Sequence, residues 1–244
     1  MHDLELAKLE KEAIGLYVSS HPIDYFSLQE KYIAHTPIQR LNEMLKSPEQ
    51  EDDNAVDVGL DMMGKNTRAE IFKHIGVPFT IIGMLSECKT LMSKKGNPYG
   101  RFSLTDRTGD IDFTVFGSQF GMLKNLLIDD NFVIINLQYQ KGRYDADKIE
   151  PLFHSIKELP SAFERTKSLT FDFDMELITN SNMVTVHRTL TEHPGENPIH
   201  FQIKDSANNT LNYSSTQSAL IDVPLVRALD AIPDINFSLV FKES

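Results

Sequence analysis

The chain has 244 residues, of which 41% are hydrophobic, and carries a formal net charge of −11 at pH 7. This length is enough for two buried cores, but the negative charge argues against phosphate binding over the whole surface, because such binding depends largely on Lys and Arg. The single cysteine, Cys88, excludes an internal disulfide, and no apolar run approaches the roughly 20 residues that span a bilayer. We therefore expect a cytoplasmic protein that contacts no membrane and holds no metal or cofactor.

The first 46 residues are predicted to form a helical entry segment. Apolar residues recur at spacings of three and four between Leu6 and Tyr17, as on one face of a helix. The residue before Pro22 is pushed out of the helical region, so this helix is expected to end near Ser19 and Ser20. A second short helix is predicted after the capping-box pattern of residues 36–39, with Thr36 as its N-cap.

Residues 47–75 contain many acidic and few large apolar side chains, including Glu49, Glu51, Asp52 and Asp53. Such a segment buries too little surface to hold a fixed structure. We interpret it as an acidic linker, with an acidic docking motif as the alternative.

Residues 76–160 change to the period-two alternation of β-strands. Strands are expected near residues 79–85, 99–105, 111–116, 132–139 and 148–157, with a short helix at 120–127. Three strands, a helix and two strands form the order of a five-stranded OB barrel, whose helix closes the bottom of the barrel. Gly83, inside the first strand, suggests a bulge or sharp bend.

Residues 161–244 form a third pattern, in which strands and helices alternate. We expect strands near 169–173, 199–203, 210–214 and 235–241, and helices near 181–193 and 223–229. The order βαββαβ predicts a small ferredoxin-like α+β domain, although another α+β arrangement shares it. With the helical entry segment and the OB barrel, this gives a multi-domain, β-rich chain.

The basic residues are distributed unevenly. Residues 76–160 hold 10 basic and 10 acidic side chains, whereas 161–244 hold 6 and 11. Within the barrel, residues 88–107 contain five basic side chains and a single acidic one. This stretch is the best candidate for phosphate contacts.

The loop between the first two barrel strands borders the ligand groove in OB domains. It supplies cations for a nucleic-acid backbone and an aromatic face for a base, which is what single-strand binding requires. The candidate residues are Lys94, Lys95, Asn97, Tyr99 and Arg101. The alternative is an ordinary solvated, positively charged hairpin.

Four further residues are candidates for the same groove. Phe116 is expected to face the opposite side of its strand from Phe113. Because Phe113 is expected in the core, Phe116 is the better stacking candidate. Arg143, Tyr144 and Lys148 lie at the loop between strands four and five, from which they would close the groove. An exposed hairpin without a ligand is the alternative reading of that loop.

Two chemical motifs have simpler explanations. Asp110 and Asp112 form an Asp-x-Asp pair that a turn and an outward strand position explain without a metal. Residues 119–123 resemble a sliding-clamp peptide faintly, but Phe120 and Leu123 are expected to face the barrel. With no carboxylate cluster or activated nucleophile, the sequence predicts no catalytic residue.

The motifs Ser19-Ser20-His21-Pro22, Lys94-Lys95-Gly96-Asn97 and Leu104-Thr105-Asp106-Arg107-Thr108-Gly109 occur in this order. In this respect the chain resembles the C-terminal region of the bacterial DNA polymerase III alpha subunit, from about Leu9 to Phe241. The resemblance is strong up to Pro160 and weaker beyond it.

The resemblance implies a non-catalytic part of a DNA-directed DNA polymerase in DNA replication. The catalytic aspartates of that family belong to a palm domain upstream. The OB domain would lie near single-stranded DNA, and the last domain would contact the tau subunit of the clamp loader and other holoenzyme subunits. A stand-alone OB module for protein contacts or tRNA is the alternative.

Residues 161–244 carry a net negative charge and therefore suit a protein partner better than a phosphate backbone. Candidate docking residues are Phe237, Leu239 and Phe241 on the final strand, with Arg227 and Asp230 on the second helix. The alternative is that the three strand residues simply complete the core of the sheet.

Overall fold

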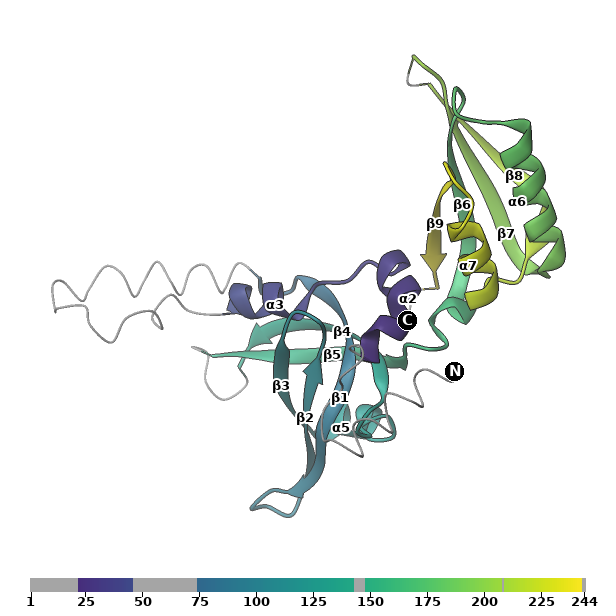
Figure 1. Ribbon diagram of the computed structural model, residues 1–244. Helices are drawn as coiled ribbons and strands as arrows, with labels where there is room; N and C mark the ends of the chain where they lie inside the picture. The colour runs from purple at the N-terminus through teal and green to yellow at the C-terminus, as the bar shows by residue number, and fades with distance from the viewer. Residues whose placement is uncertain (1–21, 46–73, 143–147, 208, 243–244) are drawn as a thin grey trace, which may run out of the picture. The chain divides into compact units, whose positions relative to one another are not determined.

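The computed structural model describes residues 22–45, 74–142, 148–207 and 209–242 (Figure 1). The helix expected up to Tyr17, most of the acidic linker, and Arg143 and Tyr144 lie outside these residues. The described residues form two compact units. The first contains residues 22–25 and those of Ala34–Leu159, and the second contains Phe26–Ile33 and those that follow Leu159.

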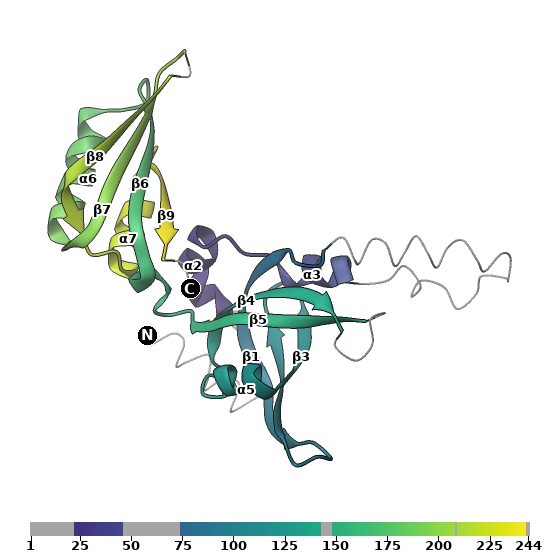
Figure 2. The same cartoon turned by 180° about the vertical axis from the view of Figure 1, so that it is seen from behind.

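The first unit is a five-stranded antiparallel sheet in the order β3-β2-β1-β4-β5. Its strands are β1 (Pro78–Met92), β2 (Pro98–Thr105), β3 (Asp110–Phe116), β4 (Phe132–Lys141) and β5 (Ile149–Glu158). Helix α5 (Gly117–Leu123) joins β3 to β4. This is the OB-fold element order that the sequence predicts. Figures 1 and 2 show the curved sheet and the long β1–β2 hairpin extending from it.

Alternating residues of β2 and β3 face the core of the first unit. Phe102 and Phe113 are almost completely buried, with ring centroids 5.4 Å apart. Helix α5 adds Phe120 and Leu123 to the same core, as predicted. Burying one such side chain contributes about 1.5–3 kcal/mol. At Gly100 a Cβ atom would lie 2.9 Å from the Phe120 ring, so the packing of α5 on β2 requires glycine there.

Gly83 does not form a β-bulge, which was one of the two features that the sequence suggests there. The pairing of β1 with β4 continues without a shift through Gly83. A Cβ atom at this position would lie 2.8 Å from the carbonyl oxygen of Thr105, so glycine permits the close approach of a neighbouring strand. The register shift lies between Ser86 and Lys89, where Glu87 has a φ of 52°.

Helix α3 (Ile38–Leu45) is capped by a distant loop. The amides of Ile38 and Gln39 donate hydrogen bonds to Asp106 Oδ2 (2.8 Å) and Thr108 Oγ1 (3.0 Å). Asp106 is buried and also accepts from the amide of Gly109 at 3.0 Å. One carboxylate therefore holds both the β2–β3 turn and the start of α3, so this cap is a tertiary contact.

The second unit is a four-stranded sheet in the order β8-β7-β6-β9 with two helices. Its strands are β6 (Thr166–Asp174), β7 (Pro194–Lys204), β8 (Thr210–Ala219) and β9 (Asn236–Phe241). The 3₁₀ helix η3 (Ala162–Arg165) leads into β6, while α6 (Asn180–Glu192) and α7 (Val223–Asp230) follow β6 and β8. Asp222 caps α7 by accepting from the Leu225 amide at 2.9 Å.

The ferredoxin-like arrangement predicted for this unit is wrong, although its elements follow the order βαββαβ. That arrangement is a split βαβ, in which another strand separates the two parallel strands. Here β6 and β7 pair directly and in parallel, with Leu169 opposite Ile199. Strand β8 lies on the outer edge of β7, which suits its polar and largely exposed residues, because a central strand is covered more completely.

Residues from the entry segment complete the second unit. The 3₁₀ helix η1 (Pro22–Phe26) leads into α2 (Ser27–Tyr32), which lies beside α7 and β9 (Figure 1). The Tyr32 ring stacks on Phe237 at 4.5 Å, and both Tyr32 and Lys31 donate to Asp230. Among the described helices, none is long and apolar enough to cross a membrane.

Candidate nucleic-acid interface

The face of β1, β2 and β3 that lies opposite the core is called the outer face here. Strand pairing places Leu91, Tyr99 and Phe116 in one row across it. The rings of Tyr99 and Phe116 are stacked, with centroids 5.0 Å apart and an interplanar angle of 26°. Phe116 is 59% exposed. This row forms an apolar, partly aromatic ledge that is open to solvent.

A row of polar side chains runs beside the ledge. Arg101 pairs with Lys89 on β1 and with Thr114 on β3. The two rows are two residues apart along each strand, a spacing of about 7 Å. In the part of the chain that the structure describes, no residue forms a hydrogen bond or ion pair with the Arg101 guanidinium. An apolar, partly aromatic row and a row with two cations therefore lie side by side on the outer face.

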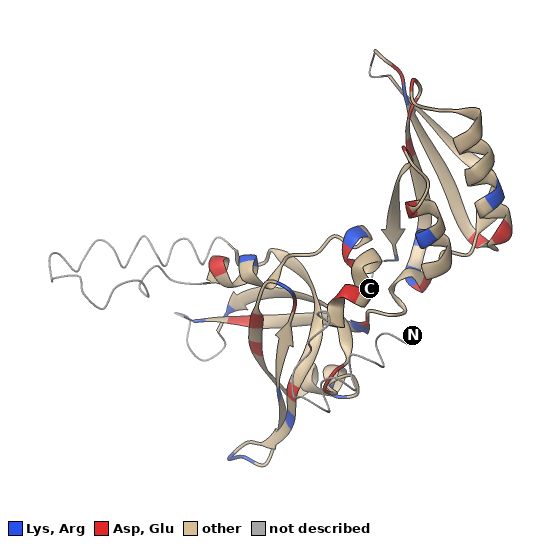
Figure 3. Ribbon diagram, viewed as in Figure 1, with Lys and Arg blue, Asp and Glu red and all other residues tan. Residues whose placement is uncertain are grey.

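The β1–β2 turn presents further cations. Lys94 and Lys95 are exposed at the tip of the hairpin, where Figure 3 shows basic segments. The turn is ordered by Ser93, whose hydroxyl accepts from the amide of Asn97 at 3.0 Å, and Gly96 takes a φ of 78°. The predicted residues Lys94, Lys95, Asn97, Tyr99 and Arg101 thus belong to one hairpin that also carries the two rows.

A bulge in β1 determines which side chains reach the outer face. Ser86 pairs with Ser103 and Lys89 with Arg101, so two residues of β1 oppose Phe102 alone. In a regular strand, Lys89 would lie on the same face as the buried Leu85 and would therefore point toward the core. The extra residue inverts this alternation. Sequence periodicity therefore missed Lys89 and Leu91 as site residues.

The amide of Cys88 holds the bulge in place. It donates to Asp129 Oδ1 at 2.7 Å, which ties β1 to the loop between α5 and β4. Burial, followed by the hydrogen bond and negative charge of Asp129, raises the pKa of the Cys88 thiol to about 12. Cys88 is therefore protonated at neutral pH and plays a structural part at the bulge.

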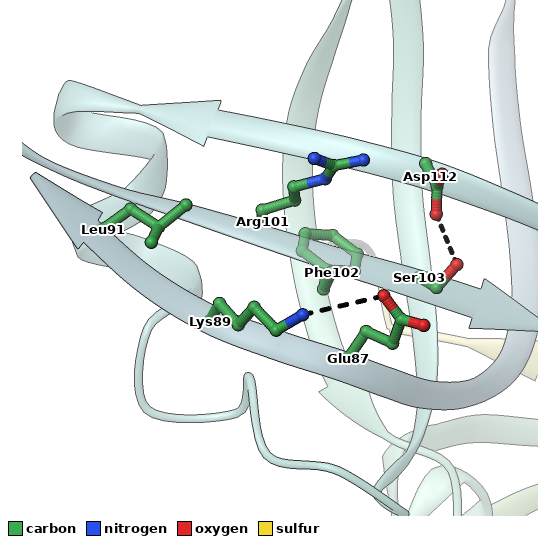
Figure 4. A pocket seen from close by; sticks show the side chains of 7 residues that line it. All are labelled: Glu87, Lys89, Leu91, Arg101, Phe102, Ser103 and Asp112. Carbon is green, nitrogen blue, oxygen red and sulfur yellow. Dashed lines mark hydrogen bonds and ion pairs between the residues drawn. The ribbon is translucent and has the colours of Figure 1, made fainter. Parts of the chain in front are cut away.

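A shallow pocket opens on the outer face next to the bulge (Figure 4). The Ser103 hydroxyl donates to Asp112 Oδ1 at 2.5 Å, and the Nζ atom of Lys89 lies 3.8 Å from the Oε2 atom of Glu87. The lining residues are Glu87, Lys89, Leu91, Arg101, Phe102, Ser103 and Asp112. Carboxylates and cations therefore share one hollow, which the sequence analysis did not identify.

Other predicted residues lie apart from these rows. Lys148 is exposed immediately before β5, and its carbonyl accepts from the amide of Gly142 at 2.7 Å. Strand β5 is separated from β1 by β4 in the sheet order. Arg143 and Tyr144 lie outside the described residues, so groove closure by this loop stays a prediction. The described residues contain no group of three or more potential metal ligands.

The candidate docking residues of the second unit differ from one another in how far they are buried. Phe237 is 9% exposed and packs on Tyr32 and Phe171, so it belongs to the core of the second unit. Leu239 and Phe241 on the same strand are half-buried. On α7, Asp230 is bonded to Lys31 and Tyr32, whereas Arg227 is exposed.

No family model matches the chain. A fold match to the mitochondrial single-stranded DNA binding protein Rim1 of S. cerevisiae has a TM-score of 0.26 and 20% sequence identity. It covers 34% of this chain and 94% of that one.

Curated relatives in several bacteria are DNA polymerase III alpha subunits. The Thermus aquaticus subunit is 24% identical over 83% of this chain, and the Aquifex aeolicus subunit is 28% identical over 69%. The subunit from Pseudomonas aeruginosa is 24% identical over 88%. The chain spans only 14%, 12% and 15% of these three proteins, respectively. Over most of its length, therefore, the chain is similar in sequence to one part of the bacterial DNA polymerase III alpha subunit.

Proposed function

We propose that this chain is a non-catalytic part of a bacterial replicative DNA polymerase, and that its OB unit holds single-stranded DNA. The observation that carries the proposal is the stacked pair Tyr99 and Phe116, open to solvent beside Arg101 and Lys89. Bases stack on aromatic side chains regardless of sequence, while cations follow the backbone. The sequence similarity to the polymerase supports the replicative setting.

Each base stacked on the ledge would contribute about 1–3 kcal/mol. Phosphates would contact Arg101 and the two hairpin lysines, Lys94 and Lys95. The net charge of −11 opposes the approach of a polyanion. We therefore expect weak, salt-sensitive binding with little dependence on sequence for most positions of the strand.

Fluorescence anisotropy with a labelled oligo-dT tests this assignment. The variant K94A/K95A/R101A is expected to bind more weakly than the wild type. A matched control, K124A/K167A/K204A, removes the same charge from exposed sites elsewhere and should lose much less affinity. Equal losses in both variants would favour diffuse attraction over a site on the outer face.

The second unit suits a protein partner, and the resemblance implies the tau subunit of the clamp loader or another holoenzyme subunit. Its net negative charge disfavours nucleic acid, and it exposes apolar side chains at Met175, Leu177, Leu211 and Tyr213. A pulldown with tau is expected to retain the chain, and the exposed substitutions L211A and R227A should separate a strand surface from a helix surface. Failure of the folded wild type to bind tau would remove this part of the proposal.

The proposal also predicts no polymerase or nuclease turnover by the isolated chain. The purified protein should leave primed and single-stranded DNA unchanged in the presence of magnesium. Turnover that EDTA abolishes would contradict the non-catalytic assignment.

A further inference from the structure

We propose that the pocket on the outer face binds the edge of a guanine base in the bound strand. This inference rests on the proposed function and deepens it. A phosphate-binding face is best served by cations alone, yet Glu87 and Asp112 line the same hollow as Lys89 and Arg101 (Figure 4). Carboxylates repel a phosphate backbone, but they accept hydrogen bonds from the amino groups of bases.

The polar groups of the pocket complement those of guanine. Guanine presents two acceptors, O6 and N7, to which Arg and Lys donate. Beside O6 it presents two donors, the N1–H group and the 2-amino group. Two carboxylates and two cations match this set, whereas thymine offers one donor group, and cytosine and adenine one amino group each. Guanine can therefore form hydrogen bonds with more of the lining side chains than any other base.

The positions of the side chains suit a single planar ligand. Arg101 pairs with Thr114, and Asp112 is two residues before Thr114 on β3, so the Arg101 and Asp112 side chains are diagonal neighbours on one face. Diagonal neighbours in a sheet are about 7–8 Å apart, a separation that a base edge can bridge. One oxygen of Asp112 accepts from Ser103, and a carboxylate has further acceptor sites.

The bulge indicates that the pocket is specifically built. Glu87 takes a φ of 52°, a conformation that a residue with a Cβ atom adopts only where the surrounding structure holds it there. The same bulge brings Glu87 and Lys89 onto the outer face, and Asp129 fixes it through the Cys88 amide. Bulges that redirect side chains in this way are common beside functional sites.

Binding of four labelled oligonucleotides tests the inference with the full chain. The set is oligo-dT and the same strand with one central guanine, cytosine or hypoxanthine, which lacks the 2-amino group of guanine. We expect the guanine strand to bind about 5- to 150-fold more tightly than oligo-dT, the range of one good bidentate base contact. The hypoxanthine strand should lose part of this gain.

Single substitutions assign the preference to the pocket. D112N and E87Q should each reduce the preference for guanine, while the matched variant D110N, which removes the same charge outside the pocket lining, should keep it. Circular dichroism of each variant checks the fold. A guanine preference that survives both D112N and E87Q would contradict the inference.

The remaining outcomes separate the inference from the proposed function. Equal, salt-sensitive binding of all four strands would overturn the guanine pocket and leave single-strand binding intact. No binding to any strand would overturn both. Free dGMP that binds as tightly as the guanine strand would assign the pocket to a nucleotide, which also contradicts a site for a base within DNA.

Discussion

Tyr99 and Phe116 lie side by side across the β2–β3 pair, with their ring centroids 5.0 Å apart. Tyr99 is half-buried, whereas Phe116 is 59% exposed. An exposed phenylalanine adds little to the stability of the folded protein. Stacked on a neighbouring ring and next to a row of cations, it is well placed to receive a base.

The first prediction concerns Phe116. F116A should weaken oligo-dT binding by about 1–3 kcal/mol, because one stacking surface is removed. Its free energy of unfolding in urea should change by less than about 1 kcal/mol, since the side chain is largely exposed. I128A is the matched control, as Ile128 is 57% exposed and lies outside the two rows. Equal loss of affinity in both variants would be evidence against stacking at Phe116.

The second prediction concerns two glycines of the first unit. G83A should lower the free energy of unfolding by about 1–3 kcal/mol or more, because the added Cβ would lie 2.8 Å from the Thr105 carbonyl oxygen. G121A should be neutral or stabilising, since this position in α5 is open and alanine favours helix. Urea unfolding of both variants is the measurement. A neutral G83A would show that β1 and β2 are not packed as closely as described.

The third prediction concerns the strained residue of the bulge. E87G should leave the free energy of unfolding unchanged or raise it by up to about 1 kcal/mol, because glycine adopts a positive φ readily. S86G, one residue earlier in the regular part of β1, should instead lower it by about 0.5–1 kcal/mol. Marked destabilisation by E87G would mean that the Glu87 side chain supports the fold.

The fourth prediction concerns the pH dependence of the second unit. Partial burial raises the pKa of Asp230, but hydrogen bonds from Lys31 and Tyr32 and the charge of Lys31 outweigh it, so the pKa is lowered overall. The resulting stability is present above the unfolded pKa of about 4 and is lost as pH falls through the lower folded pKa. Wild type should therefore exceed D230N in stability at pH 7.

Urea unfolding at pH 7 and at several values below pH 4 measures this difference. The gap between wild type and D230N should narrow on acidification. D234N, which removes another charge from the same unit, is the control. A gap that stays constant down to pH 2 would show that ionised Asp230 does not hold α2 in place.

The sequence predicted much of the OB unit and less of the rest. Alternation in β2 and β3 was sufficient to place Phe102 and Phe113 in the core and Phe116 outside it. The bulge in β1 was not predictable from the sequence. A single extra residue exchanges the two faces on which later side chains lie, but it leaves no recognisable pattern in the amino-acid composition. The pocket residue Glu87 was missed for the same reason, whereas Asp112 was expected on the outward side of its strand but was not assigned to a site.

Local sequence patterns could not predict how the strands of the second unit pair. The element order was correct, but it does not determine whether β8 inserts between β6 and β7 or extends the edge. The contacts of α2 were also unpredictable, since Tyr32 and Phe237 are far apart in the sequence and meet only in the fold. The cap of α3 by Asp106 was also unpredictable, since it joins residues that are 68 positions apart in the sequence.

The central claim is that phosphates bind to the basic residues of the β1–β2 hairpin. Its most direct test is the dependence of log K on log[salt] for oligo-dT binding, measured with wild type and K94A/K95A/R101A. The slope for the variant is expected to be shallower by about 0.7 for each phosphate that the variant no longer binds. Identical affinities and slopes for the two proteins would contradict it and favour an OB unit used for protein contacts.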